Sequence, residues 1–89
     1  DRYSASGEIN STVTDQSEVT ERVRREWQER PGVDVDELDG LTISDDNWWF
    51  NLRPSNTEPL LRLNVEADDP ATMAKLRDEV LQTVGRGAQ

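Results

Sequence analysis

The sequence predicts a two-layer α+β domain in which two helices cover one face of an antiparallel four-stranded sheet, in the order β-α-β-β-β-α. Three observations predict this fold. Two segments carry apolar residues at helical spacing, and each follows a residue that can cap a helix. Four other segments alternate apolar and polar residues, as half-buried strands do. Short turns between consecutive strands imply antiparallel neighbours, and two amphipathic helices need a sheet face to cover.

The first strand and the first helix are predicted near the N-terminus. Within residues 7–14, Ile9 and Val13 fall on one face, which indicates a half-buried strand. Asp15 can cap the helix that follows, and residues 31–32, a Pro-Gly pair, end it. The apolar stripe of this helix repeats every four residues and consists of Val19, Val23 and Trp27.

The middle of the chain predicts two further strands. Residues 33–40 are acidic and turn-like, residues 41–43 form a short strand, and residues 45–47 form a hairpin turn. In the strand that begins at Trp48, alternate residues face the core, so Arg53 lies on the opposite face at the strand end. The inward residues of this strand are Trp48, Phe50 and Leu52.

The last strand and the second helix complete the sheet and its cover. In residues 60–65 the apolar positions alternate with polar ones, which turns Arg62 away from the core. Asp69 caps the second helix and Pro70 takes its first position, while Gly85 is the expected stop. The apolar stripe of this helix is Met73, Leu76, Val80 and Val84.

Length and composition limit the possible functions. Eighty-nine residues make one domain, for which we expect a linker or hinge at residues 1–5, a folded part at 6–85 and a frayed tail at 86–89. Nineteen acidic and ten basic residues give a net charge of −9, which disfavours nucleic acid and membrane partners. Without cysteine or histidine, the chain lacks the usual metal ligands and general base. No signal peptide is evident, so a cytoplasmic location is expected.

No catalytic residue and no metal site is predicted in this chain. The acidic run at residues 34–40 departs from the spacing of a calcium-binding EF-hand, because Leu38 occupies a ligand position and the glycine comes one place late. A solvated acidic loop explains the run better. The serines near the N-terminus have no base partner that would make them nucleophiles.

The loop between the last two strands carries the residues with the clearest chemistry. Arg53 offers a planar fork of donors that matches phosphate oxygens, and Ser55 and Thr57 add hydroxyl groups. Successive backbone N–H groups in a tight turn form a concavity that binds anions. Asn56 tolerates a left-handed backbone, so it suits the crown of such a turn. These groups suit a phosphate, but from the residues alone an ordinary surface hairpin, which uses similar turn residues, explains the loop slightly better.

The loop resembles the phosphate-binding loop of the α-D-phosphohexomutases, specifically of the bacterial phosphomannomutase/phosphoglucomutase branch. The family pattern is Arg-x-Ser-(Asn or Gly)-Thr-x-Pro, and Arg53, Ser55, Asn56, Thr57 and Pro59 match it in place. The resemblance extends to residues 6–10, 39–41 and 60–67, and so covers most of the chain. It implies the last of four domains of such an enzyme, with a TATA-binding-protein-like α+β fold.

The resemblance implies a role in holding the phosphate group of a phosphosugar. The implied ligands are Arg53, Ser55, Asn56 and Thr57. Arg62 matches a second arginine of the family nine residues after the first, and a solvated strand arginine is an equal alternative for it. The phosphoserine and the magnesium-binding loop of the family belong to other domains, so this chain alone should be inactive and free of cofactors. Its other partners would be those three domains.

Three further interpretations remain open at this level. The free face of the sheet could instead make the chain a stand-alone α+β module that binds a protein partner. Trp49 faces away from the predicted core, where contact with a neighbouring domain is a better explanation than stacking on a sugar. Glu58 could orient one of the two arginines or simply be solvated.

Overall fold

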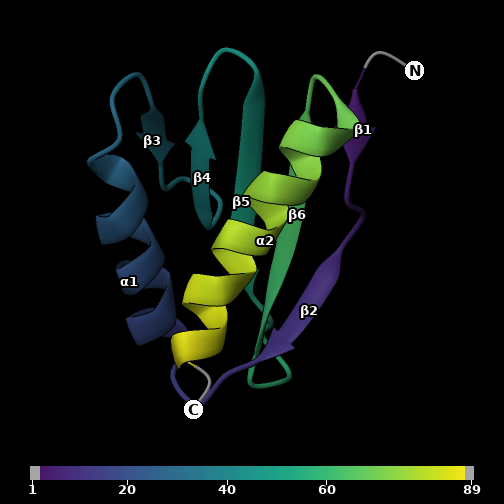
Figure 1. Ribbon diagram of the computed structural model, residues 1–89. Coiled ribbons are helices and arrows are strands. Elements are labelled where there is room, and N and C mark those ends of the chain that lie inside the picture. Colours follow the sequence, from purple (N-terminus) through teal and green to yellow (C-terminus); the bar gives the residue numbers. More distant parts are fainter. Residues whose placement is uncertain (1–2, 88–89) are drawn as a thin grey trace.

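The chain folds into two layers, with two helices on one face of an antiparallel sheet (Figure 1). The structure, a computed structural model, describes residues 3–87. Helix α1 spans Gln16–Gln28 and helix α2 spans Pro70–Gly87, and the two helices contact each other as well as the sheet. The α+β class, the antiparallel sheet and the single helical layer are as the sequence predicts. Among the described residues, no helix is both long and apolar enough to cross a membrane.

The sheet has more strands than the four expected. Its order is β1-β6-β5-β4-β3, and β2 also pairs with β6, beyond the end of β1. All pairs are antiparallel. The six strands are β1 (Ser4–Ala5), β2 (Ile9–Thr12), β3 (Asp34–Asp36), β4 (Leu41–Ser44), β5 (Trp48–Pro54) and β6 (Leu60–Ala67).

Both additional strands come from segments that the sequence assigned to irregular structure. The predicted linker is wrong at residues 4–5, because β6 runs on to Ala67 and its last residues pair with β1. Gly7, at a φ of 73°, lies between β1 and β2, which both pair with β6. The predicted turn region is wrong at residues 34–36, because the edge of β4 offers them a ladder of hydrogen bonds. The partner of β1 is distant in sequence, so local pattern gives no signal for β1. β3 instead forms a short hairpin with β4, and it escapes the pattern because none of its three residues is buried.

The two helices begin where the sequence predicts. The Asp15 carboxylate accepts a hydrogen bond of 3.1 Å from the Glu18 N–H, which caps α1. At α2, Asp69 accepts from the Thr72 N–H at 2.8 Å and from the Thr72 hydroxyl at 2.8 Å. These bonds to Thr72 hold the pKa of Asp69 below its usual range, because they favour the charged carboxylate.

The end of α2 differs from the prediction. The helix continues through Gly85 to Gly87, so glycine is not its stop and residues 86–87 are not part of a frayed tail. A glycine inside a helix costs only about 1 kcal/mol relative to alanine, which the rest of a long helix offsets. Residues 88–89 of the predicted tail, like residues 1–2 of the predicted linker, lie outside the described residues.

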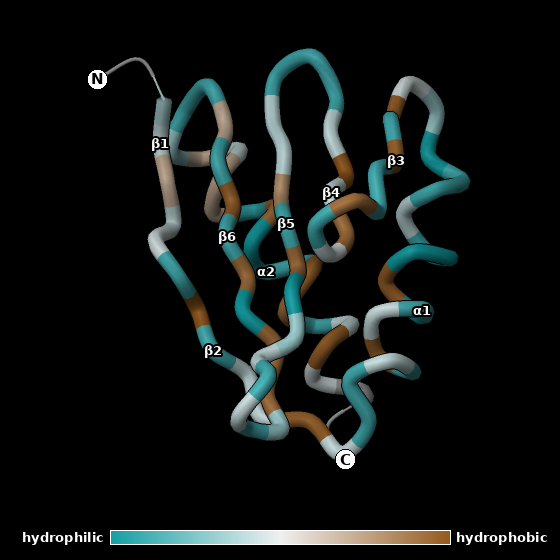
Figure 2. The backbone as a smooth tube through the Cα atoms, turned by 180° about the vertical axis from the view of Figure 1, so that it is seen from behind, coloured by the Kyte–Doolittle hydropathy of each residue, from teal (hydrophilic) through white to brown (hydrophobic). Residues whose placement is uncertain are grey.

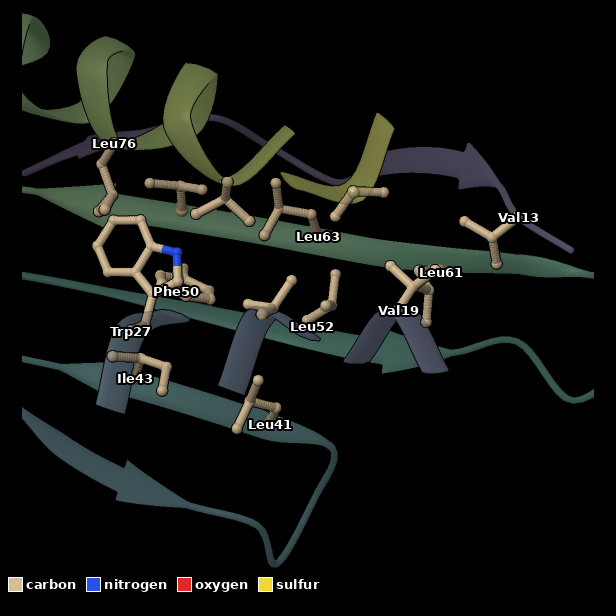
Figure 3. Close-up of a cluster of buried hydrophobic side chains, with 14 residues drawn as sticks. Val13, Val19, Trp27, Leu41, Ile43, Phe50, Leu52, Leu61, Leu63 and Leu76 are labelled. Carbon is tan, nitrogen blue, oxygen red and sulfur yellow. The ribbon is translucent and has the colours of Figure 1, made fainter. Parts of the chain in front are cut away.

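The core lies between the helices and the inner face of the sheet (Figure 3). Strands β4, β5 and β6 each contribute every second residue to the core. Their alternate residues face away from it, as the banded colouring of β5 and β6 shows (Figure 2). The predicted helical stripes and inward strand residues are in this cluster or packed against it. Its buried members are Val13, Val19, Val23, Trp27, Leu41, Ile43, Phe50, Leu52, Leu61, Leu63, Val65, Leu76, Val80 and Val84.

An aromatic group occupies one end of this core. Trp27 is completely buried and packs edge-on against Phe50 at 5.1 Å and Trp48 at 5.6 Å between ring centroids. The Arg30 guanidinium lies 3.5 Å from the Trp27 ring centroid and forms an ion pair with Glu79 of α2. The Trp27 indole N–H has no acceptor among the described residues, so the ring contributes by packing rather than by hydrogen bonding.

We therefore expect Trp27→Ala to destabilise the fold by about 3–5 kcal/mol, and Trp27→Phe to cost much less because no hydrogen bond is lost. A domain of this size is stable by about 4–13 kcal/mol, so the alanine variant should lose a large fraction of its free energy of unfolding. Urea denaturation followed by fluorescence measures both values. Trp49→Ala is the matched control, because Trp49 is 38% exposed and its loss should cost under about 1 kcal/mol. A Trp27→Ala variant as stable as this control would contradict the assignment.

Candidate functional site: an anion cleft beside two opposed arginines

All five predicted site residues line one open cleft at the end of β5 and β6. The cleft has a volume of about 520 Å³. Three further residues complete its wall, and the sequence did not propose them as site residues: Asp39 and Gly40 from the β3–β4 turn, and Pro54 at the end of β5. The predicted residues that line it are Arg53, Ser55, Asn56, Thr57 and Arg62.

Two arginines occupy directly paired positions of the β5–β6 strand pair. Arg53 of β5 and Arg62 of β6 are direct partners in the antiparallel register, on the face of the sheet that no helix covers. Like charges directly opposite each other destabilise a sheet unless an anion compensates them. The arrangement therefore favours the ligand interpretation of Arg62 over that of an isolated solvated arginine.

Each arginine already has one carboxylate partner. The Arg53 Nη1 donates to Asp39 at 3.3 Å, and the Arg62 Nη1 donates to Glu8 at 3.1 Å. Both acids are well exposed to water, so these pairs are weak and can be exchanged for another anion. Each guanidinium also has further N–H donors, because one nitrogen alone makes these contacts. Glu58 is not such a partner, since among the described residues it forms no ion pair with either arginine.

The loop that follows β5 is closed by its own serine. Ser55 is only 7% exposed, and its Oγ accepts long hydrogen bonds, each of 3.3 Å, from the N–H groups of Thr57 and Glu58. The Thr57 hydroxyl lies 3.4 Å from the same oxygen. Two backbone N–H groups and two hydroxyls thus converge within a few residues, as in an anion-binding turn. Asn56 is exposed at the tip of this loop.

The expected left-handed conformation of Asn56 is wrong. Among the described residues, a positive φ occurs only at glycines, so Asn56 has an ordinary backbone. The Ser55 hydroxyl provides the reason, since a side-chain cap over the next N–H groups turns the chain without a left-handed residue. Asn56 therefore contributes its side chain to the cleft rather than a special backbone angle.

Gly40 fixes where the Arg53 side chain lies. Its φ is +71°, and a Cβ added there would be 2.4 Å from the Arg53 Cγ and 2.7 Å from the Leu52 carbonyl oxygen. Asn51 holds this turn in place, since its amide donates to the Asp39 carbonyl at 2.9 Å. No local pattern predicts this contact, because the turn and Arg53 meet only through the β4–β5 pairing.

A neighbouring cavity of about 320 Å³ offers less for an anion. It lies between α1 and the β3–β4 turn, and the guanidinium that lines it, Arg24, is paired with Glu21 and Glu37. The hydrogen bond from Arg24 holds the pKa of Glu21 below its usual range, and the same bond raises the pKa of Arg24. Both groups are therefore charged at neutral pH and compensate each other.

The donor set does not suit the magnesium ion that the resemblance implies for a whole enzyme. Among residues 3–87, no three or more acidic, histidine or cysteine side chains are grouped closely enough to hold a metal ion. Among the described residues that line the cleft, Asp39 is the one with a carboxylate, and it is paired with Arg53. A cation would bind next to two guanidinium groups there, which is electrostatically unfavourable.

Known proteins share both the sequence pattern and the fold of this chain. Residues 8–83 match the family described as phosphoglucomutase/phosphomannomutase, C-terminal domain. The chain belongs to this family. It is 46% identical over 85 residues to a phosphomannomutase of Methanocaldococcus jannaschii, and 40% identical over 82 residues to one of Escherichia coli. These alignments cover 96% and 92% of the chain but only 18% of either relative.

The fold of this phosphoglucomutase/phosphomannomutase C-terminal domain also matches a solved structure. A crystal structure of a phosphoglucomutase/phosphomannomutase family protein from Burkholderia thailandensis superposes with a TM-score of 0.72 at 22% identity. The match covers the whole chain and 19% of that protein. At this identity the match shows the fold alone, and it agrees with the α+β architecture described above.

The contact between Gly40 and Arg53 gives a prediction with an internal control. Gly40→Ala should destabilise the domain by about 1–2 kcal/mol through its positive φ and by about 1–3 kcal/mol more through the clash with Arg53. Gly32→Ala should lose only the stability that the positive φ costs. Gly32 has a φ of +81°, but nothing lies within 4 Å of a Cβ added there. Urea denaturation of both variants measures the difference. Equal losses in the two variants would show that Gly40 does not constrain Arg53.

Proposed function

We propose that this domain binds the phosphate group of a phosphosugar in the cleft between Arg53, Arg62 and the 55–57 loop. The observation that carries the proposal is the direct opposition of two arginines across β5 and β6, beside a turn rich in N–H and hydroxyl donors. The chain carries a net charge of −9, so two arginines side by side, each held only by one exposed carboxylate, form a local positive site on an acidic surface. A phosphate dianion compensates both charges at once.

The cleft would recognise phosphate through charge-assisted hydrogen bonds. The guanidinium forks offer paired donors that match two phosphate oxygens, and the hydroxyls of Ser55 and Thr57 with the Asn56 amide offer donors to the rest. The bound anion would replace the exposed carboxylates of Asp39 and Glu8, which exchange with water at little cost. Such a site selects a phosphate and leaves the sugar free to present either end.

We also propose the part that this domain plays in a longer enzyme. Its relatives named phosphomannomutases are more than five times as long as the chain, and in such an enzyme this domain would hold the phosphate that does not react. Holding that group aligns the sugar with the reacting groups of other domains, which converts binding into a rate gain. The interconversion of hexose 1-phosphate and hexose 6-phosphate, the location in the cytoplasm and the dependence on magnesium belong to that whole enzyme. The domain alone would be inactive.

The open sheet face would contact the other domains. Trp49 lies on this face with 38% of its surface exposed, and its indole N–H donates to Glu66 at 3.1 Å. The bond fixes the ring across the β5–β6 pair, with Tyr3, itself half exposed, lining the same shallow pocket. An aromatic side chain held in this way supplies contact area at a low entropic cost. This position is at the opposite end of β5 from Arg53.

The first test measures phosphate binding by the domain alone. Titration with glucose 6-phosphate should shift the backbone amide resonances of Ser55, Asn56 and Thr57 with a Kd on the order of 1 mM, or about 4 kcal/mol, because one domain supplies only part of a substrate cleft. An equal ionic strength of sodium chloride is the control for nonspecific screening. Shifts confined to the two helices, with the loop silent at saturating ligand, would contradict the proposal.

The second test uses the longer enzyme that carries this domain. Arg53→Ala should lower kcat/KM about 10- to 150-fold, because a hydrogen bond to a charged group is worth roughly 1.5–3 kcal/mol. Arg53→Lys should recover only part of the loss, since an ammonium keeps the charge without the fork. Steady-state kinetics on both variants, with thermal melts to establish folding, measure the effect.

Arg77→Ala is the matched control for this experiment. It removes the same charge from an exposed position on α2, where Arg77 pairs with its neighbour Asp78. Its kcat/KM should stay within about twofold of wild type, since surface substitutions away from a site have small effects. A well-folded Arg53→Ala enzyme with wild-type efficiency would show that the loop is assigned wrongly.

A further inference from the structure

One side chain outside the cleft makes three hydrogen bonds to the loop that forms it. The Gln16 Nε2, in the first turn of α1, donates to the carbonyl oxygens of Leu60 at 2.8 Å, Ser55 at 3.0 Å and Glu58 at 3.1 Å. These carbonyls are 39–44 residues away in sequence and lie at the two ends of the loop. The contact is absent from the family pattern quoted above, which lies wholly within the loop.

The same carbonyls take part in closing the loop. The Ser55 N–H donates to the Leu60 carbonyl at 3.0 Å, and the Leu60 N–H donates to the Glu58 carbonyl at 2.8 Å. Gln16 therefore binds the neck of the loop at the point where its two strands separate. One half-buried amide fixes both ends against the N-terminus of α1.

The direction of these bonds matters for an anion. The three carbonyl oxygens are directed toward Gln16, which lines the neighbouring cavity and not the arginine cleft. Carbonyl oxygens carry partial negative charge and would repel a phosphate, whereas hydroxyl and N–H groups attract it. With these carbonyls bound to α1, the hydroxyl-bearing residues Ser55 and Thr57 line the cleft.

We infer that Gln16 is a positioning residue for phosphate binding, which holds the 55–60 loop in its donor-outward conformation from the first turn of α1. This inference rests on the proposed function of the cleft. A loop that is ordered before the ligand arrives binds more tightly, because binding then loses no conformational entropy in ordering the loop. Gln16 touches no ligand itself and acts only through the loop backbone.

Two substitutions test the inference on the 89-residue chain. Gln16→Met keeps a similar length and removes the donors, while Gln16→Glu places a carboxylate against three carbonyl oxygens. Both should weaken binding of inorganic phosphate about three- to tenfold. Both should also speed hydrogen exchange at the amides of Ser55, Thr57 and Glu58 in the free protein. A carboxylate near a helix N-terminus is otherwise stabilising, so Gln16→Glu should melt no lower than Gln16→Met.

The control is Gln28→Met at the other end of α1, where the Gln28 side chain accepts from Arg24 at 2.7 Å. It should leave phosphate binding and loop exchange unchanged. Thermal midpoints within about 4 °C of wild type show that all the variants fold. The hydrogen-exchange rates of the loop amides decide between the two explanations. If Gln16 contributed only to overall stability, its substitution would lower the thermal midpoint without speeding exchange at the loop amides in particular.

Each outcome has one meaning. If wild-type protein binds phosphate at the loop and Gln16→Met binds equally well, the inference fails and the proposed function stands. If Gln16→Glu alone weakens binding, repulsion by the new charge is the cause and the inference fails. If wild-type protein does not bind phosphate, the proposed function fails and the inference fails with it. Weaker binding and faster loop exchange in both Gln16 variants, with Gln28→Met unchanged, support it.

Discussion

The antiparallel register of β5 against β6 is the constraint on which the rest of this structure depends. It pairs Phe50 with Val65 and Leu52 with Leu63, which places the largest apolar side chains of both strands under the helices. Because side chains alternate along a strand, the same register brings Arg53 opposite Arg62 on the open face. A shift of one residue would bury both arginines and expose the core. Stability of the core and geometry of the cleft are therefore set by one pairing.

The cleft is held from three sides by groups that need not touch a ligand. Gly40 leaves room for the Arg53 side chain, Asn51 anchors the turn that carries Gly40, and Gln16 holds the loop neck from α1. Each contact joins segments that are far apart in sequence but adjacent in the sheet or across its edge. An anion site made of backbone and long side chains requires such support, because arginine and a free loop are otherwise flexible.

The sheet divides the molecule into two faces. The apolar face is closed by α1 and α2 and provides the stability of the domain. The polar face carries the two arginines at one end of β5 and the exposed Trp49 at the other. The proposed phosphate site and the exposed aromatic side chain therefore lie at the two ends of one sheet face.

The sequence by itself determined the parts of the structure that depend on neighbours along the chain. Period and capping predicted both helix starts, and alternation predicted which residues of β5 and β6 are buried. The same alternation placed Arg53 and Arg62 on one face. The loop motif together with the second arginine of the family named five of the eight residues that line the cleft.

Only the tertiary structure decided what depends on partners distant in sequence. Pairing with β6 converted residues 4–5 from predicted linker into a strand, because a short edge segment owes its conformation to the ladder it joins. Long-range contacts also decided the contributions of Gln16 and Gly40. Two corrections are local instead: residues 34–36 form a short hairpin with β4, and the neighbouring Ser55 hydroxyl turns the loop at Asn56 without a left-handed residue. Local pattern fixes periodicity, whereas a contact between remote segments exists only once the sheet has assembled.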